Sequence, residues 1–464
     1  MQDESIDGFR LSPQQKRLWQ LQAAGNNQPY RAHCAVLIEG NLNLEILKLA
    51  LQDVINRHEI LRTTFRVLEG MNLPLQAIGN CNISNSFQTN FLEEQTINIE
   101  LLLQEAAKRH FDWNDSLLLE ISLVIVDQEK AVLLIGFPSL LGDWVTLNNL
   151  VCEISRSYAA CLQDEKRSDE PLQYADIAEW QNELFEGEEG KIAKEYWQNP
   201  NKKILTNYRL PLEKQPTVKA EFNPTFISLE LNPDTIAQLD AIAQNYNTSI
   251  SILLQACWCI LLWRLTGQSD VVIGTYCDGR DYEELDSALG LLAKYLPIYS
   301  ALEETFKFSE ILKQTREATE EAFKWQESFT WEQNENFFPV GFEFEEQPAT
   351  YAAANVSFSI QRQYVCLDRF KIKLSCLRRD DSLIAEFHYD ANLFQVEDIE
   401  RIARQFQTLL ESAINQPEAA IGELEILSAS EQHQLLIEFN NTQTEYSKHQ
   451  CIHQLFEDWT AKTP

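Results

Sequence analysis

The chain has 464 residues, of which 44% are hydrophobic and 23% charged, a composition typical of folded globular proteins. Its 70 acidic residues outnumber the 38 basic ones, which gives a net charge of −32. A field of that sign repels nucleic-acid phosphates and anionic membrane surfaces, so no nucleic-acid or membrane binding is expected of the chain as a whole.

Targeting signals and cysteine usage point to the cytoplasm. Residues 1–7 carry acids and no apolar run, which is unlike a signal peptide. The most apolar stretch, residues 250–263, is too short to cross a bilayer. The ten cysteines have no CxxC spacing, so we interpret them as reduced thiols and expect a cytoplasmic protein without a metal site.

The first part of the chain alternates helix and strand signals. Ser12 followed by Pro13 and Gln15 is typical of a helix start, and Asn43 is a second candidate cap. Two apolar runs separated by a polar turn, 119–126 and 131–137, predict a β-hairpin. Further helices are predicted over 147–158, 155–162 and 175–184.

The second part repeats this mixture. Helices are predicted over 235–244, 249–265 and 395–414, and strands over 270–275 and 385–389, with Gly267 ending the second of these helices. Residues 416–430 are predicted to form a linker, and residues 435–464 are predicted to begin a further domain. The predicted division is an α/β lobe over 1–178, a second over 179–415, and a linker with the start of a further domain over 416–464.

Several segments, in this order, resemble motifs of the condensation domains of nonribosomal peptide synthetases. They are 11–19 (LSPQQKRLW), 57–65 (RHEILRTTF), 174–181 (YADIAEWQ) with Tyr196 and Trp197, Gly279 and Arg280, 289–292 (LGLL) with Leu296 and Pro297. The tail is similar to the join with an adenylation domain, at 439–442 (FNNT), Tyr446 and 451–457 (CIHQLFE).

The resemblance implies a two-lobed fold and a set of partners. Each lobe would resemble chloramphenicol acetyltransferase, and the two would meet in a V around a central tunnel. The tunnel would admit phosphopantetheine arms of peptidyl or acyl carrier proteins, and no cofactor would be bound directly. In active members, the second His of an HHxxxDG motif deprotonates or orients the acceptor amine that attacks the donor thioester.

The catalytic motif departs from this pattern. The matching segment, 137–146, reads FPSLLGDWVT, so Pro138 and Ser139 stand at the two His positions and Trp144 replaces the Gly. A serine hydroxyl has no useful basicity near neutral pH, so Ser139 is not expected to act as the base. The motif also keeps Asp143, for which the resemblance implies a structural ion pair with Arg280.

The predicted tunnel residues are Pro138, Gly142, Trp144, Lys294 and Tyr295, the last two replacing the family's Asn-Thr pair. The Trp144 ring would either narrow the tunnel or turn inward and fill core.

Two other features receive structural interpretations. None of the seven histidines lies near this motif in sequence, and His58 is interpreted as a partly buried, hydrogen-bonded side chain. The acids that alternate with aromatics over 342–346 are expected to face solvent.

Two functions follow from these observations. The first hypothesis, which the resemblance implies, is a condensation-type domain that no longer forms amide bonds and serves for carrier docking, as a structural element or for recruiting a tailoring enzyme. The alternative is an unusual active domain that joins carrier-bound acyl and aminoacyl thioesters by positioning alone.

Overall fold

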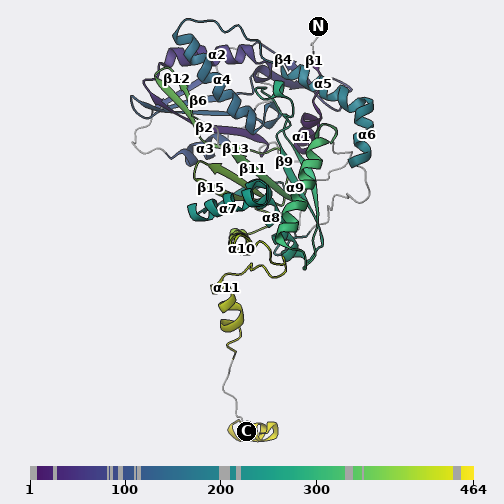
Figure 1. Ribbon diagram of the computed structural model, residues 1–464. Coiled ribbons are helices and arrows are strands. Elements are labelled where there is room, and N and C mark those ends of the chain that lie inside the picture. The colour runs from purple at the N-terminus through teal and green to yellow at the C-terminus, as the bar shows by residue number, and fades with distance from the viewer. Residues whose placement is uncertain are drawn as a thin grey trace.

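The computed structural model describes residues 8–23, 29–80, 83, 87–91, 98–108, 111, 117–197, 209–215, 221–329, 338–346, 350–442 and 451–463. His110, Tyr446 and His449 lie outside these ranges. Two six-stranded sheets and a small three-stranded one organise this part of the chain. The chain is therefore a mixed α/β protein with two lobes, as predicted (Figure 1).

The first sheet has the strand order β12-β13-β2-β7-β6-β5. Its strands are β12 (Tyr351–Ala353), β13 (Val356–Val365), β2 (Arg31–Gly40), β7 (Lys130–Pro138), β6 (Glu120–Ile125) and β5 (Phe87–Phe91). The hairpin predicted around residue 128 is confirmed as the antiparallel pair β6–β7. Helices of this lobe are α1 (Pro13–Ala23), α2 (Leu44–Arg57), α3 (Ile99–Ala107), α4 (Trp144–Leu162), α5 (Tyr174–Glu186) and α6 (Glu188–Trp197).

The second sheet has the order β10-β9-β11-β14-β15-β8. Its strands are β10 (Lys294–Ala301), β9 (Asp270–Cys277), β11 (Val340–Glu346), β14 (Ile372–Arg379), β15 (Ser382–Asp390) and β8 (Pro224–Leu231). The helices of this lobe are α7 (Pro233–Asn245), α8 (Ile250–Thr266), α9 (Phe308–Lys324) and α10 (Val396–Asn415). The predicted buried helix is α8, and Gly267 ends it with a left-handed φ of 69°.

The third sheet is β1 (Gly8–Phe9), β4 (Leu75–Ile78) and β3 (Thr63–Arg66). The start of α1 beside it is capped as predicted, because the Ser12 Oγ accepts from the Gln15 backbone and the Gln15 side chain accepts from the Ser12 backbone. Asn43 likewise caps α2.

The two lobes exchange chain segments, which the predicted boundary between residues 178 and 179 misses. That boundary falls inside α5, and β12 and β13 join the first sheet although they follow most of the second lobe in sequence. Leu289 and Leu292, which follow β9, are likewise buried in the first core. Pairing at a sheet edge depends on backbone groups brought from afar, so a local pattern does not reveal it.

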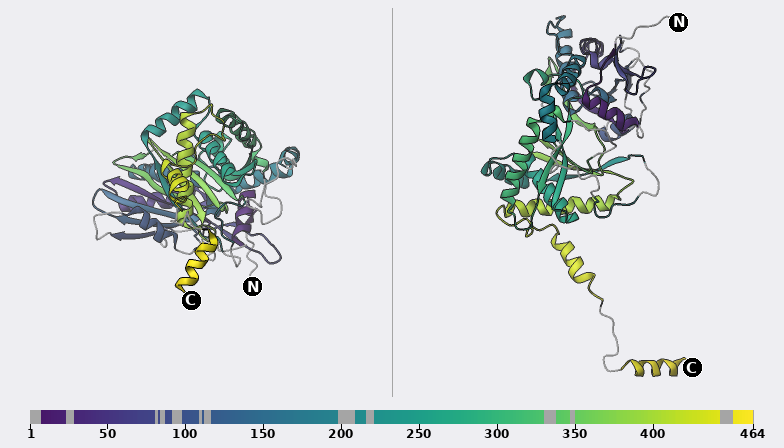
Figure 2. Two further views of the ribbon diagram at one scale, coloured as in Figure 1. Left: turned by 90° about the horizontal axis from the view of Figure 1, so that it is seen from below. Right: turned by 90° about the vertical axis from the view of Figure 1, so that its right-hand side faces the viewer.

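The tail continues the chain away from the second lobe (Figure 2). Ile421 and Leu424, in the predicted linker, are buried in the second core. Beyond them lie α11 (Ala429–His433) and α12 (Ile452–Lys462), whose side chains are exposed or half-buried.

No single helix among the described residues has the length and apolarity to span a membrane; α7 and α8 pass that test only as a pair, bent by 100°. The nine cysteines in the described ranges are free, and six of them are buried.

Candidate functional site

The motif segment forms the connection from β7 to α4. Pro138 ends β7 opposite Arg31 of β2, and residues Ser139–Leu141 form one short 3-10 turn. The Ser139 backbone N–H donates to the Tyr30 carbonyl at 3.2 Å. Gly142 follows, and a Cβ there would lie 2.4 Å from Cγ2 of Thr146. Glycine is therefore required at 142 by close approach to the first turn of α4.

Asp143 is the N-cap of α4 and is fully buried. Its Oδ1 accepts from the Thr146 backbone at 2.9 Å and from the Thr146 hydroxyl at 2.8 Å. Its Oδ2 accepts from the backbones of Leu292 and Ala293, each at 2.9 Å. The two Arg280 Nη groups lie 3.1 Å from the two carboxylate oxygens.

This ion pair is electrostatically coupled. Burial raises the pKa of Asp143, but the charge and hydrogen bonds of Arg280 outweigh burial, so the pKa lies below its ordinary value. The carboxylate thus stays ionised and ties α4 to the segments that follow β9. Asp143 and Arg280 form the ion pair that the motif resemblance implied, and the pair holds α4 against the segment after β9.

Ser139 is fully buried, and its Oγ has no hydrogen-bond partner among the residues the structure describes. No basic side chain of the described residues hydrogen-bonds this hydroxyl. Trp144, the first residue of α4, is half-buried and packs against the first core. Its Nε1 is also buried without a partner in the described ranges. The packing is what the core-filling interpretation of Trp144 expects.

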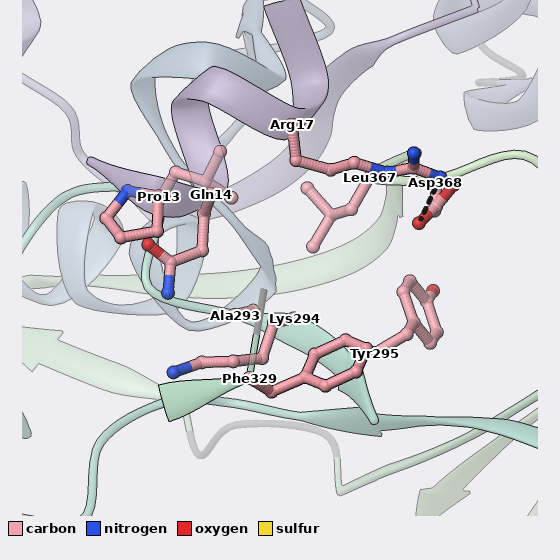
Figure 3. Close-up of a pocket in the computed structure, with 10 residues that line it drawn as sticks. Pro13, Gln14, Arg17, Ala293, Lys294, Tyr295, Phe329, Leu367 and Asp368 are labelled. Carbon is pink, nitrogen blue, oxygen red and sulfur yellow. Dashed lines mark hydrogen bonds and ion pairs between the residues drawn. The ribbon is translucent and has the colours of Figure 1, made fainter. Parts of the chain in front are cut away.

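Lys294 and Tyr295 begin β10 and line a narrow cavity of about 50 Å³ (Figure 3). Arg17 of α1 and Asp368 form an ion pair of 3.0 Å across it. Lys294 Nζ donates to the Gln326 carbonyl at 3.2 Å. The other predicted tunnel residues, Pro138, Gly142 and Trp144, are not among the lining residues of this cavity.

The Tyr295 hydroxyl donates to Glu343, whose other oxygen accepts from Lys373 Nζ at 2.6 Å. The prediction that the acids of 342–346 face solvent is therefore wrong for Glu343, whose side chain is 13% exposed. Strand β11 pairs with β9 along one edge and with β14 along the other, so Lys373 of β14 lies next to Glu343 and compensates its largely buried carboxylate.

His58 is more deeply buried than predicted, at 3% exposed, and its Nε2 lies 3.3 Å from Glu153 Oε2. A second histidine, which sequence reasoning missed, lies next to the motif. His33 of β2 pairs in register with Gly136 of β7, three residues before Ser139. In the sequence, Arg31 and His33 alternate with apolar residues, which indicates that their side chains lie on one face of a strand. This pattern points to the motif only once β2 is known to pair with β7.

The model of the condensation-domain family matches residues 6–436. The chain belongs to the condensation-domain family. Bacitracin synthase 1 of Bacillus licheniformis is 25% identical over 472 residues, and tyrocidine synthase 2 of Brevibacillus parabrevis is 28% identical over 477 residues. Each alignment covers 98% of this condensation domain, but only 9% of the first synthase and 13% of the second.

Solved structures share the fold. The first condensation domain of the calcium-dependent antibiotic synthetase, in complex with a substrate analogue, has a TM-score of 0.78 at 15% identity over 92% of this chain and 100% of that one. An X-domain of teicoplanin biosynthesis, solved in complex with OxyB, has a TM-score of 0.76 at 22% identity over 91% of this chain and 96% of that one. The condensation-domain fold, with its two lobes resembling chloramphenicol acetyltransferase, is thus established.

Proposed function

We propose that this condensation domain forms no amide bond itself and acts within a nonribosomal peptide synthetase as a platform that receives carrier-bound substrates. The observation that carries the proposal is Ser139 at the position of the motif His. Its hydroxyl is buried and has no basic partner in the described part of the chain. An acceptor ammonium must lose a proton before it attacks a thioester, and an unassisted serine does not remove it.

The neighbouring imidazole does not replace the missing base. Burial and the charge of Arg31 lower the pKa of His33 to about 3. An α-ammonium group has a pKa of about 8. An imidazole whose conjugate acid is so much stronger leaves the proton on the amine, so His33 does not support the alternative of an active domain.

The partners follow from the family. Carrier proteins bearing phosphopantetheine would dock on the domain, and an adenylation domain would follow the tail, as 451–457 suggest. An X-domain solved in complex with OxyB has the same fold. This similarity supports the more specific proposal that the domain recruits a tailoring enzyme. Because the net charge is −32, docking of acidic carriers would use local basic or apolar patches.

The test combines chemistry with binding. The protein is incubated with an aminoacyl-carrier donor and an aminoacyl-carrier acceptor, and peptidyl product is measured by intact-mass spectrometry. We expect no product above the protein-free reaction, together with saturable binding of a carrier in fluorescence anisotropy. Peptide formed well above background would overturn the proposal and establish the active alternative, and absence of carrier binding would remove the platform function.

A further inference from the structure

An apolar groove lies between helix α5 and the segment that follows β9. Its volume is about 420 Å³. Helix α5 lies at the edge of the molecule (Figure 1), and Tyr282, on the opposite wall, is 47% exposed, so the groove opens to solvent. Its lining includes Asp176, Ile177, Trp180, Leu184, Tyr282 and Glu284.

The α5 wall of the groove is a stripe of apolar side chains. Ile177, Trp180 and Leu184 stand at positions i, i+3 and i+7 of α5, so they share one face of the helix. Trp180 and Leu184 are only half-buried, so the protein itself does not fully cover this stripe. A second amphipathic helix laid along the stripe would remove both side chains from water.

The rim of the groove is acidic. Asp176 and Glu284 are exposed, and neither forms an ion pair with another residue that the structure describes. Glu179, on the same helix, differs because Arg10 lies 2.6 Å from it and neutralises it. No Lys or Arg is among the described residues that line the groove. Two uncompensated carboxylates beside apolar side chains favour a partner that carries cations next to its own apolar side chains.

The two aromatic rings of the groove favour one kind of cation. The ring centroids of Trp180 and Tyr282 are 5.4 Å apart, and their planes meet at 86°. Because Tyr282 is exposed, aromatic surface remains open on the wall that also carries Glu284. A guanidinium group can stack on such a ring and still pair with a carboxylate, whereas an ammonium group lacks the planar stacking surface.

Two other occupants suit the groove less well. A second copy of this chain, placed by a two-fold axis, would bring the acidic rim of one groove against that of the other, and like charges repel. An acidic carrier protein would be repelled in the same way. The charge of the rim therefore selects against both.

We propose that this groove docks an amphipathic helix of a partner protein, with apolar side chains on the α5 stripe and an arginine against Tyr282 and the acidic rim. The inference rests on the proposed function, in that the helix belongs to the tailoring enzyme that the domain recruits. It deepens that function by naming the docking surface and the chemistry of the segment that binds there.

The test uses synthetic peptides. The probe is a fluorescein-labelled helix with leucines on one face and arginines flanking them, and fluorescence anisotropy gives its Kd for the intact protein. Three companion peptides replace the arginines by lysine, the arginines by glutamate, or the leucines by serine. We expect the lysine peptide, which has the same charge, to bind about threefold more weakly because it does not stack on the aromatic rings. The glutamate and serine peptides should show no saturable binding.

Variants of the protein locate the binding. Tyr282→Ala should remove the difference between the arginine and lysine peptides. The double variant Asp176→Asn, Glu284→Gln should weaken the arginine peptide about fivefold. The double variant Glu129→Gln, Asp381→Asn removes the same charge from exposed positions elsewhere and should leave the Kd nearly unchanged. Thermal unfolding verifies that each variant is folded.

Four results would overturn the inference: no saturable binding of the arginine peptide, equal affinity for the arginine and lysine peptides, equal weakening by the two double variants, or loss of carrier binding in folded Tyr282→Ala. The last result would make the groove a carrier site. The carrier assays on the wild type are independent of these titrations. Peptide product or absent carrier binding there refutes the proposed function, whereas failure of the titrations alone refutes only this inference.

Discussion

Arg280 and Asp143 are 137 positions apart in sequence and form a buried ion pair that joins the segment after β9 to the N-terminus of α4. Asp143 belongs to segment 137–146, so the pair fixes where that segment lies. The ion pair gives Asp143 a structural role that does not depend on which residues stand at positions 138 and 139.

Breaking this pair should be costly. Arg280→Met leaves an uncompensated carboxylate at Asp143, and we expect a loss of about 3–5 kcal/mol in the free energy of unfolding. Urea denaturation followed by circular dichroism measures it. Arg378→Met is the matched control, because its pair with Asp240 is partly exposed and should contribute less than about 1 kcal/mol. Equal, small losses in both variants would contradict the structural role.

Gly290 occupies a second position that tolerates no side chain. Its φ is +145°, and a Cβ would lie 1.9 Å from Cδ2 of Tyr174. We expect Gly290→Ala to destabilise the protein by about 2–5 kcal/mol, from backbone strain and overlap together. Gly70→Ala separates the two causes, since Gly70 has φ +85° with no atom within 4 Å of an added Cβ. If Gly290→Ala lowers the free energy of unfolding by no more than Gly70→Ala does, the Tyr174 ring must move aside without cost.

The His58–Glu153 contact predicts a dependence on pH. Burial raises the pKa of Glu153, but hydrogen bonds from His58 and Arg167 outweigh it and hold the pKa at about 2. In the unfolded chain a glutamate titrates near 4.3. The stabilisation is therefore fully present above about 4.3 and is lost as the pH falls toward about 2.

We expect the difference in urea midpoint between wild type and Glu153→Gln to be largest near neutral pH and to narrow across that acidic window. Glu129→Gln, in an exposed turn, should show no such narrowing. A gap of constant size for Glu153→Gln would show that the effect comes from packing and not from ionisation.

Restoring one histidine should not restore chemistry. In Ser139→His the imidazole enters a fully buried turn, and the first His position is still Pro138. We expect no peptide product in the carrier assay. The double variant Ser139→His, Trp144→Gly is measured in the same assay. Product from the double variant alone would identify the Trp144 side chain as the obstruction. Product from the single variant would refute an obstructed site.

Local patterns predicted most of the helices and the β6–β7 hairpin. Asn43 caps α2, and Gly267 ends α8, because caps depend on residues within one helical turn. The alternation at 342–346 misled for Glu343, because alternation does not show which side chains of other strands lie beside it. Lys373 of β14 and Tyr295 of β10 both hydrogen-bond this carboxylate. Pairing of β13 with β2 was also invisible to local reasoning.

By itself, the sequence determined the family and the mixed α/β class, and the motif resemblance aligned Pro138 and Ser139 with the two His positions. Those conclusions depend on residue identities and short spacings. Only the tertiary structure decided that His33 lies beside the motif, that Asp143 receives Arg280, and that α5 and the segment after β9 line one groove. Each of these is a contact between segments far apart in the chain, and such contacts arise when strands pair and cores close.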